Sequence, residues 1–119
     1  MNSEDLKKRF KEFSINTALL IKELQQDTIN KAYCNQLIRC SSSPGANYRA
    51  ACRAKSTADF INKLKIVEEE LDESIYFLEL LQYFNAEMSV RFNILIKEAS
   101  ELLAIIVASL KTSRANRNS

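Results

Sequence analysis

Glycine and proline occur only once each in this 119-residue sequence, as the adjacent pair Pro44 and Gly45. Because these two residues mark most turns, a chain that holds so few of them favours a small number of long secondary-structure elements. A loop-rich β-sandwich, a collagen and a disordered chain are excluded, since 46% of the residues are hydrophobic and 27% are charged. The length suits one compact domain, because domains cluster near ~100 to 150 residues.

Apolar residues recur at alternating spacings of four and three along four segments, which is the pattern of an amphipathic helix. The first of these stripes consists of Leu6, Phe10, Phe13, Thr17, Leu20 and Leu24. We predict helices over about residues 4–26, 29–54, 57–83 and 86–112. The expected fold class is all-α, an antiparallel up-down-up-down four-helix bundle over residues 1–112, followed by a polar flexible tail over residues 113–119.

The Pro44–Gly45 pair lies inside the second predicted helix, directly after Ser41, Ser42 and Ser43. An interior proline costs a helix ~3 kcal/mol, and a glycine costs ~1 kcal/mol relative to alanine. The segment therefore either interrupts the helix or bends it, with the serine hydroxyls capping the freed backbone groups. We predict a Pro-kinked second helix.

The sequence contains no His, which removes imidazole both as a general base and as a metal ligand. Ferritin-like di-iron bundles need a Glu-x-x-His motif on two helices, so the acidic run over residues 68–73 is expected to form ion pairs instead. The spacing of Cys34, Cys40 and Cys52 fits neither a metal knuckle nor a disulfide framework, and we expect reduced, mostly buried thiols. We therefore expect no enzyme activity, catalytic residue, metal, cofactor or small-molecule substrate.

No apolar segment of the sequence is long enough to suggest a signal peptide or a membrane span. Charged residues interrupt the first apolar positions through Glu12, and the longest uncharged apolar stretch, Leu102 to Leu110, is far shorter than the ~20 residues that a span needs. We expect a cytoplasmic protein with no membrane partner.

Cationic residues are densest near the end of the second predicted helix. Arg49 and Arg53 are four residues apart, which would place them on one helical face beside Lys55, and Tyr48 offers one ring for stacking. Arg39 would join that face if the bend at Pro44 permits. These side chains would bind phosphate groups, or alternatively they would pair with the acidic residues of the third helix, Glu68, Glu69, Glu70, Asp72 and Glu73.

Two further cationic clusters, residues 7–11 and residues 111–117, would meet at one end of an up-down-up-down bundle as a basic rim. The alternative is that they only aid solubility and complement the dipole of the last helix.

The fourth predicted helix is apolar on more than one face between Leu102 and Val107. A small bundle covers only the inner side of each helix, so an outer apolar strip indicates a subunit interface. We predict a homo-oligomer whose interface includes Leu103, Ile105 and Val107, with Glu69 and Glu73 forming ion pairs between subunits. A monomer that tolerates the extra apolar residues is the alternative.

Residues 35–81 carry an ordered series of motifs. A Gln-Leu-x-Arg stretch precedes a Ser-Pro kink and an Asn. A Lys-Ser loop and an Asp-Phe pair follow, and then a Glu-rich helix that ends in a leucine-rich segment. The motif residues are Gln36, Leu37, Arg39, Ser43, Pro44, Asn47, Lys55, Ser56, Asp59, Phe60, Glu69, Glu70 and Leu78 to Leu81. This series resembles the bacterial four-helix-bundle family first named for proteins encoded in intervening sequences of 23S rRNA genes.

The resemblance implies a small, non-enzymatic bundle that assembles into a homopentameric ring. A related branch comprises the accessory proteins of diversity-generating retroelements, which are basic pentamers that associate with reverse transcriptase and nucleic acid. The formal charge of this chain is +2, so a pentamer would carry about +10, a field that salt screens over ~8 to 10 Å.

Two functional hypotheses follow. In the first, the protein is an oligomeric scaffold that binds RNA, DNA or a nucleic-acid-processing protein through Arg39, Arg49, Arg53 and Lys55. In the second, it is a purely structural protein–protein interaction module that binds no nucleic acid.

Overall fold

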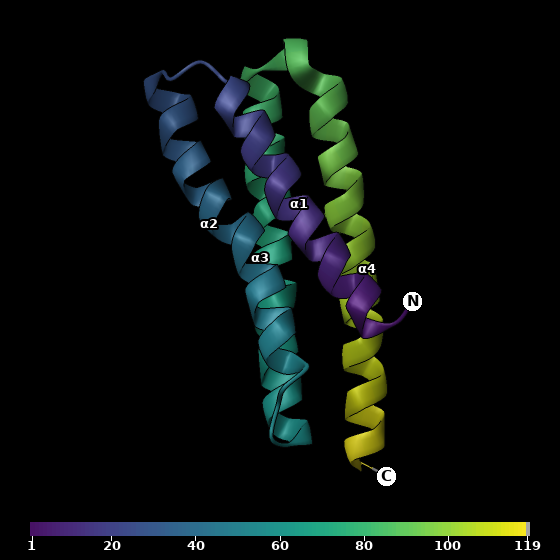
Figure 1. The fold of residues 1–119 in the computed structure, drawn as a ribbon. Coiled ribbons are helices and arrows are strands. Elements are labelled where there is room, and N and C mark those ends of the chain that lie inside the picture. Colours follow the sequence, from purple (N-terminus) through teal and green to yellow (C-terminus); the bar gives the residue numbers. More distant parts are fainter. Residues whose placement is uncertain (119) are drawn as a thin grey trace.

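The computed structural model describes residues 1–118, and these residues form four helices and no strand. The helices are α1 (Ser3–Glu23), α2 (Thr28–Ala51), α3 (Thr57–Phe84) and α4 (Ser89–Asn118), and a short 3₁₀ helix, η1 (Ala86–Met88), precedes α4. In Figure 1 the chain runs up along α1 and α3 and down along α2 and α4. The elongated molecule measures 51 × 22 × 21 Å. The predicted all-α four-helix bundle is confirmed.

Side-chain caps begin three of the helices. The Asn2 side chain accepts a hydrogen bond from the backbone N–H of Asp5 (2.8 Å), and Asp27 and Ser56 cap α2 and α3 in the same way. Each cap satisfies a backbone N–H that has no partner within its helix. Since the connections are short, each helix packs against the next.

Two helix ends differ from the prediction. Helix α2 ends at Ala51 rather than near residue 54, because the N–H groups of Arg53 and Ala54 close tight turns onto the carbonyls three residues earlier (3.1 and 3.0 Å). Helix α4 continues to Asn118, so the predicted flexible tail is helical over residues 113–118, and Ser119 lies outside the described residues. No glycine or proline stops this helix at residue 112.

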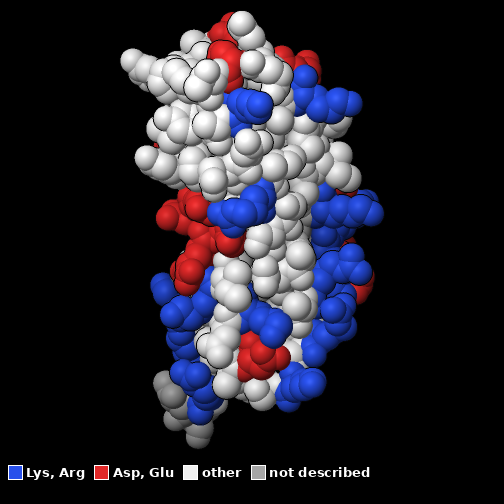
Figure 2. Space-filling model, turned by 90° about the vertical axis from the view of Figure 1, so that its left-hand side faces the viewer, with Lys and Arg blue, Asp and Glu red and all other residues white. Residues whose placement is uncertain are grey.

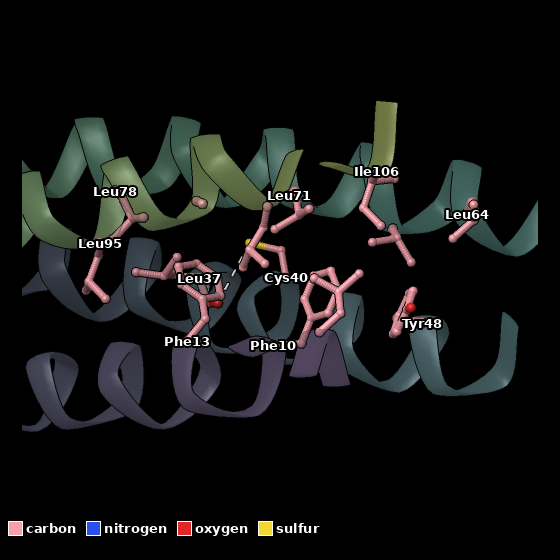
Figure 3. Close-up of a cluster of buried hydrophobic side chains, with 14 of the residues drawn as sticks. Phe10, Phe13, Leu37, Cys40, Tyr48, Leu64, Leu71, Leu78, Leu95 and Ile106 are labelled. Atoms are coloured by element: carbon pink, nitrogen blue, oxygen red, sulfur yellow. Dashed lines mark hydrogen bonds between the residues drawn. The ribbon is translucent and has the colours of Figure 1, made fainter. Parts of the chain in front are cut away.

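The core lies along the axis of the bundle, where apolar side chains from all four helices meet. Helix α1 contacts α2 and α4, and α3 contacts the same two helices, so α1 and α3 lie diagonally opposite each other. Figure 3 shows buried side chains from each helix, among them Phe10, Leu37, Leu71 and Ile106, all of which are inaccessible to solvent.

Pro44 lies within a helix that continues through it. Because proline has no N–H, the carbonyl of Cys40 loses its helical donor, and the Ser74 hydroxyl of α3 donates to it instead (2.8 Å). The next carbonyl, of Ser41, accepts a hydrogen bond from the Ser14 hydroxyl of α1 (2.8 Å). Serine hydroxyls of the neighbouring helices therefore donate hydrogen bonds to these backbone carbonyls of α2. The prediction had assigned the capping of freed backbone groups to the serines of α2 itself. A bend at Pro44 stays a prediction.

Gly45 permits a close approach of α1 to α2. A Cβ atom at this position would lie 3.2 Å from the Cβ atom of Phe10, tighter than ordinary van der Waals contact. The two helices therefore lie so close at this position that a side chain on residue 45 would require Phe10 to shift by a few tenths of an ångström.

A buried pair of amides joins the two turns at the other end of α2. Asn30 and Asn85 exchange hydrogen bonds between their side chains (3.0 and 2.8 Å), and they are only 2% and 5% exposed. Each amide also donates to a backbone carbonyl, of Gln25 (2.9 Å) and Leu81 (2.8 Å) respectively. These buried amide groups all have hydrogen-bond partners, as is usual for buried polar groups because an unpaired one would destabilise the fold.

We predict that Ser74→Ala lowers the free energy of unfolding by about 1–3 kcal/mol, because the buried carbonyl of Cys40 then loses its donor. The effect should shrink when Pro44→Ala is introduced as well, since an alanine at this position supplies the missing backbone N–H. Urea unfolding followed by circular dichroism, at one protein concentration, measures both effects as a double-mutant cycle.

Ser42→Ala is the matched control for Ser74→Ala. Its exposed hydroxyl donates to the carbonyls of Ile38 and Arg39 (2.8 and 3.1 Å), which lie before the proline interruption. We expect little change in stability from this substitution, and an equal loss from both serine variants would contradict the role assigned to Ser74.

We predict that a thiol reagent modifies one cysteine rapidly in the folded protein and that Cys52→Ser abolishes this phase. Cys34 and Cys40 are buried, and burial raises the pKa of both thiols, whereas Cys52 is exposed. Ellman's reagent measures the number of reactive thiols. Rapid modification of two or three thiols in the folded state would disprove this assignment.

Candidate nucleic-acid interface

The predicted cationic residues lie on different elements. Arg49 is in the last turn of α2, whereas Arg53 and Lys55 belong to the turn that connects α2 with α3 at the bottom of Figure 1. The expectation that Arg49 and Arg53 share one helical face is therefore wrong, because the helix ends between them. The turn nevertheless keeps all three residues at the same end of the bundle.

Arg39 forms ion pairs with α3 and does not join Arg49, Arg53 and Lys55. Its guanidinium donates to both carboxylate oxygens of Glu70 (3.1 Å each) and also to Glu73. These hydrogen bonds raise the pKa of Arg39, and the pKa of Glu70 is raised mainly by burial, with Arg39 acting in the opposite direction. Arg39 thus forms the pairing with the acidic run that the alternative interpretation assigned to Arg49 and Arg53.

The guanidinium groups of Arg49 and Arg53 have no ion-pair or hydrogen-bond partner among the described residues. Lys55 lies near Asp59, but the Asp59 carboxylate already accepts a hydrogen bond from Lys63 (2.7 Å), which is the main cause of its lowered pKa. The charges at this turn are therefore available to an outside anion.

The end of α4 adds further cations to the same end of the molecule. An open depression of about 450 Å³ lies between the α2–α3 turn and the last turns of α4, and Lys55, Phe60, Ser113 and Asn116 are among its lining residues. We call the cationic residues around it the basic end: Arg49, Arg53, Lys55, Lys111, Arg114 and Arg117.

The predicted rim between the start of α1 and the end of α4 does not form as expected. Met1 lies beside Ile105 and Thr112, so α4 extends beyond the start of α1. Arg9 is held by Glu98 (3.0 and 2.5 Å) and Glu101 (3.3 Å) of α4. The cations at the end of α4 therefore accompany the α2–α3 turn rather than the N-terminal cluster.

Tyr48 is not a stacking ring. It is 8% exposed and packs against Phe10 with 5.3 Å between the ring centroids, and burial raises its pKa to about 12. The prediction failed because α1 crosses over this face of α2.

Charge is unevenly distributed along the molecule. Figure 2, which views the side formed by α2, shows acidic side chains at mid-height and mainly Lys and Arg below them. The acidic band comprises Glu69, Glu70, Asp72 and Glu73, which line one depression together with Arg39. It lies away from the basic end, so phosphate approaching that end does not meet these carboxylates first.

The predicted oligomer-interface residues show different degrees of exposure. Leu103, Ile105 and Val107 are half-buried, and the first two pack against the core, so only part of each side chain remains for another subunit. Glu73 is held by Arg39, whereas Glu69 is exposed.

Sequence reasoning missed both the pairing of Arg39 with Glu70 and the place of the end of α4 beside the α2–α3 turn. The first had a signal: residues at equal distances from a helix–helix turn meet in an antiparallel pair, and these two lie about fifteen residues either side of it. The position of the end of α4 depends on the lengths of the helices, which the spacing of apolar residues did not define.

None of the helices in residues 1–118 combines the length and the apolar character that crossing a membrane requires. Within the same part of the chain, no group of three or more Cys, Asp or Glu side chains is arranged to hold a metal ion.

Comparison with known proteins identifies the family. The family model described as 23S rRNA-intervening sequence protein matches residues 4–108, and a search of the curated proteins finds no match. The chain is similar to the crystal structure of a protein of unknown function from the S23 ribosomal protein family of Bacteroides thetaiotaomicron, with 31% identity and a TM-score of 0.84. That likeness covers 93% of this chain and 99% of the other. The chain therefore belongs to the 23S rRNA-intervening sequence protein family, as the motifs of residues 35–81 predicted.

Proposed function

We propose that this protein is a non-enzymatic scaffold that assembles from several copies, as a homopentamer, and binds RNA or DNA through its basic end. One observation carries the proposal: Arg49 and Arg53 have no carboxylate partner in the described chain, whereas Arg9, Arg39 and Arg91 each have at least one. Guanidinium groups bind phosphate through paired, charge-assisted hydrogen bonds. Unpaired arginines that gather at one end of a molecule are suited to that role.

The position of the basic end supports the proposal. Its residues come from the end of α2, the following turn and the end of α4, so a phosphate backbone would meet cations from several elements at once. The acidic band lies higher on the molecule, and Arg39 offsets two of its carboxylates. Electrostatic attraction of this kind is independent of base sequence and decreases with salt.

RNA is the first nucleic acid to test. The family name refers to intervening sequences of 23S rRNA, and the similar Bacteroides structure is described as S23 ribosomal protein family. These names are the reason to choose a ribosomal RNA fragment as the first probe.

The second candidate function is a purely structural interaction module. It is favoured by Glu69, which is exposed and has no ion-pair partner within residues 1–118, so that an arginine of a neighbouring subunit or another protein would find it available. This candidate predicts assembly without nucleic-acid binding.

We predict that the triple variant Arg49→Gln, Arg53→Gln, Lys55→Gln weakens binding of a single-stranded RNA at least tenfold at low salt. Loss of three phosphate contacts should also reduce the slope of log K against log salt concentration by about 2, since each contact on a single strand contributes about 0.7. Fluorescence anisotropy with a labelled RNA, repeated over a salt series, measures both quantities.

The matched control is the variant Lys11→Gln, Lys22→Gln, Lys31→Gln, which removes the same charge from exposed lysines outside the basic end. It should bind RNA nearly as the unmodified protein does. Equal losses from both variants would show that net charge acts without a defined site, and unchanged binding by the first variant would refute the assignment of the basic end.

A further inference from the structure

Five of the ten aromatic side chains of the protein form a continuous group on α2 and α3, in which two half-buried rings pack against the core and three rings are exposed. Adjacent rings are 5.1 to 6.2 Å apart between centroids. We call this group the aromatic face, and its members are Tyr33, Tyr76, Phe77, Tyr83 and Phe84. Tyr76, Tyr83 and Phe84 are 57%, 80% and 47% exposed, so three rings of this group are accessible to another molecule.

A second apolar surface lies on α1 and α4. Ile15, Leu19, Val90 and Ile94 are 47%, 49%, 73% and 63% exposed, and we call them the aliphatic face. Leu19 and Ile94 line a shallow depression of about 190 Å³ between the two helices. Asn16 and Arg91 also line it, so a side chain from another molecule would find a recess that is mostly apolar.

The two faces lie on opposite sides of the bundle and at the same level. Helices α2 and α3 contact each other, as do α1 and α4, whereas the diagonal pairs do not, so the two seams are opposite. At a rise of about 1.5 Å per residue, Leu19, Ile94 and Tyr76 all lie within about 12 Å of the end that holds the α1–α2 and α3–α4 turns. This is the end opposite to the basic end.

We propose that the aromatic face of one copy of this protein packs on the aliphatic face of the next copy. This proposal rests on the assembly stated under the proposed function and names its two surfaces. Because the surfaces differ and lie back to back at one level, the contact is heterologous, and repeating it gives a ring when the rotation closes. Aromatic side chains that fill an aliphatic recess are typical anchors of protein interfaces.

Charge favours this pairing over the contact of two aromatic faces. Glu69, Asp72 and Glu79 of α3 are exposed and have no ion-pair partner among the described residues, and Tyr76 lies between them in sequence. Two aromatic faces in contact would bring these carboxylates together. The depression beside Ile94 instead holds the exposed Lys97, which has no ion-pair partner among the described residues. The three carboxylates of that depression, Glu12, Glu98 and Glu101, are each paired with Lys8 or Arg9. The exposed carboxylates of α3 oppose stacking of nucleic-acid bases on the aromatic face.

The test uses two variants of the full chain, each altered on one face. Tyr76→Glu with Tyr83→Glu disables the aromatic face, and Leu19→Glu with Ile94→Glu disables the aliphatic face. Ile66→Glu, at an isoleucine that is 41% exposed outside both faces, is the control. Size exclusion with light scattering measures the mass, and circular dichroism confirms that each variant keeps its helices.

We expect the unmodified protein and the control to be oligomers, and each face variant alone to have one subunit mass. A heterologous contact predicts a further result. An equal mixture of the two face variants should form a particle of two subunits, because the aliphatic face of one variant can bind the aromatic face of the other. An isologous contact cannot give this result, since one of the two variants would then associate with itself.

Several results would overturn the proposal: a monomeric unmodified protein, an unchanged oligomer in either face variant, or a mixture that stays monomeric. Loss of RNA binding in the aromatic-face variant without a change of mass would assign that face to nucleic acid instead. RNA anisotropy on the same samples keeps the two proposals separate. If the face variants have the expected masses but no sample binds RNA, nucleic-acid binding at the basic end would be refuted, whereas the proposed interface would be supported.

Discussion

The position of Pro44 in the middle of α2 is the constraint on which the arrangement of three helices depends. Proline removes the donor for the carbonyl of Cys40, and that group is buried, so a hydroxyl from another helix must reach it. Ser74 of α3 and Ser14 of α1 approach α2 from its two sides at consecutive carbonyls, while Gly45 lets α1 come into contact. The interruption in one helix thus fixes the register of its two neighbours.

Local sequence signals predicted the number, type and approximate extent of the helices, because caps and apolar stripes depend on residues only a few positions apart. What they did not contain is the register between helices. The bond from Ser74 to Cys40 and the ion pair from Arg39 to Glu70 join residues more than thirty positions apart, and only the second can be inferred from the sequence, by counting residues on either side of the α2–α3 turn. Tyr48 was expected at the surface for the same reason, since only the crossing of α1 buries it. The family motifs were a more specific signal, and the family model confirmed them.

The candidate site was predictable in part. The residue types and their place in the chain indicated a cationic turn after α2, but Arg39 belonged to a different set of interactions, and the contribution of α4 depended on a helix longer than expected. The basic end and the exposed aromatic and aliphatic faces lie at opposite ends of the molecule. Copies that associate through the apolar end would therefore present their basic ends side by side, so that weak contacts of individual subunits with a phosphate backbone would add.

The amide pair of Asn30 and Asn85 bears on how copies of this chain would meet. Small helical bundles can exchange helices, and here the exchange would straighten the α3–α4 turn into one long helix. That change would move Asn85 away from Asn30, and the Asn30 amide, at 2% exposure, would keep its bond to the Gln25 carbonyl but lose both bonds to Asn85, at a cost of about 1–3 kcal/mol in each subunit. The pair would therefore oppose domain swapping. Its cost favours assembly from complete bundles, with the turns of each chain closed within it.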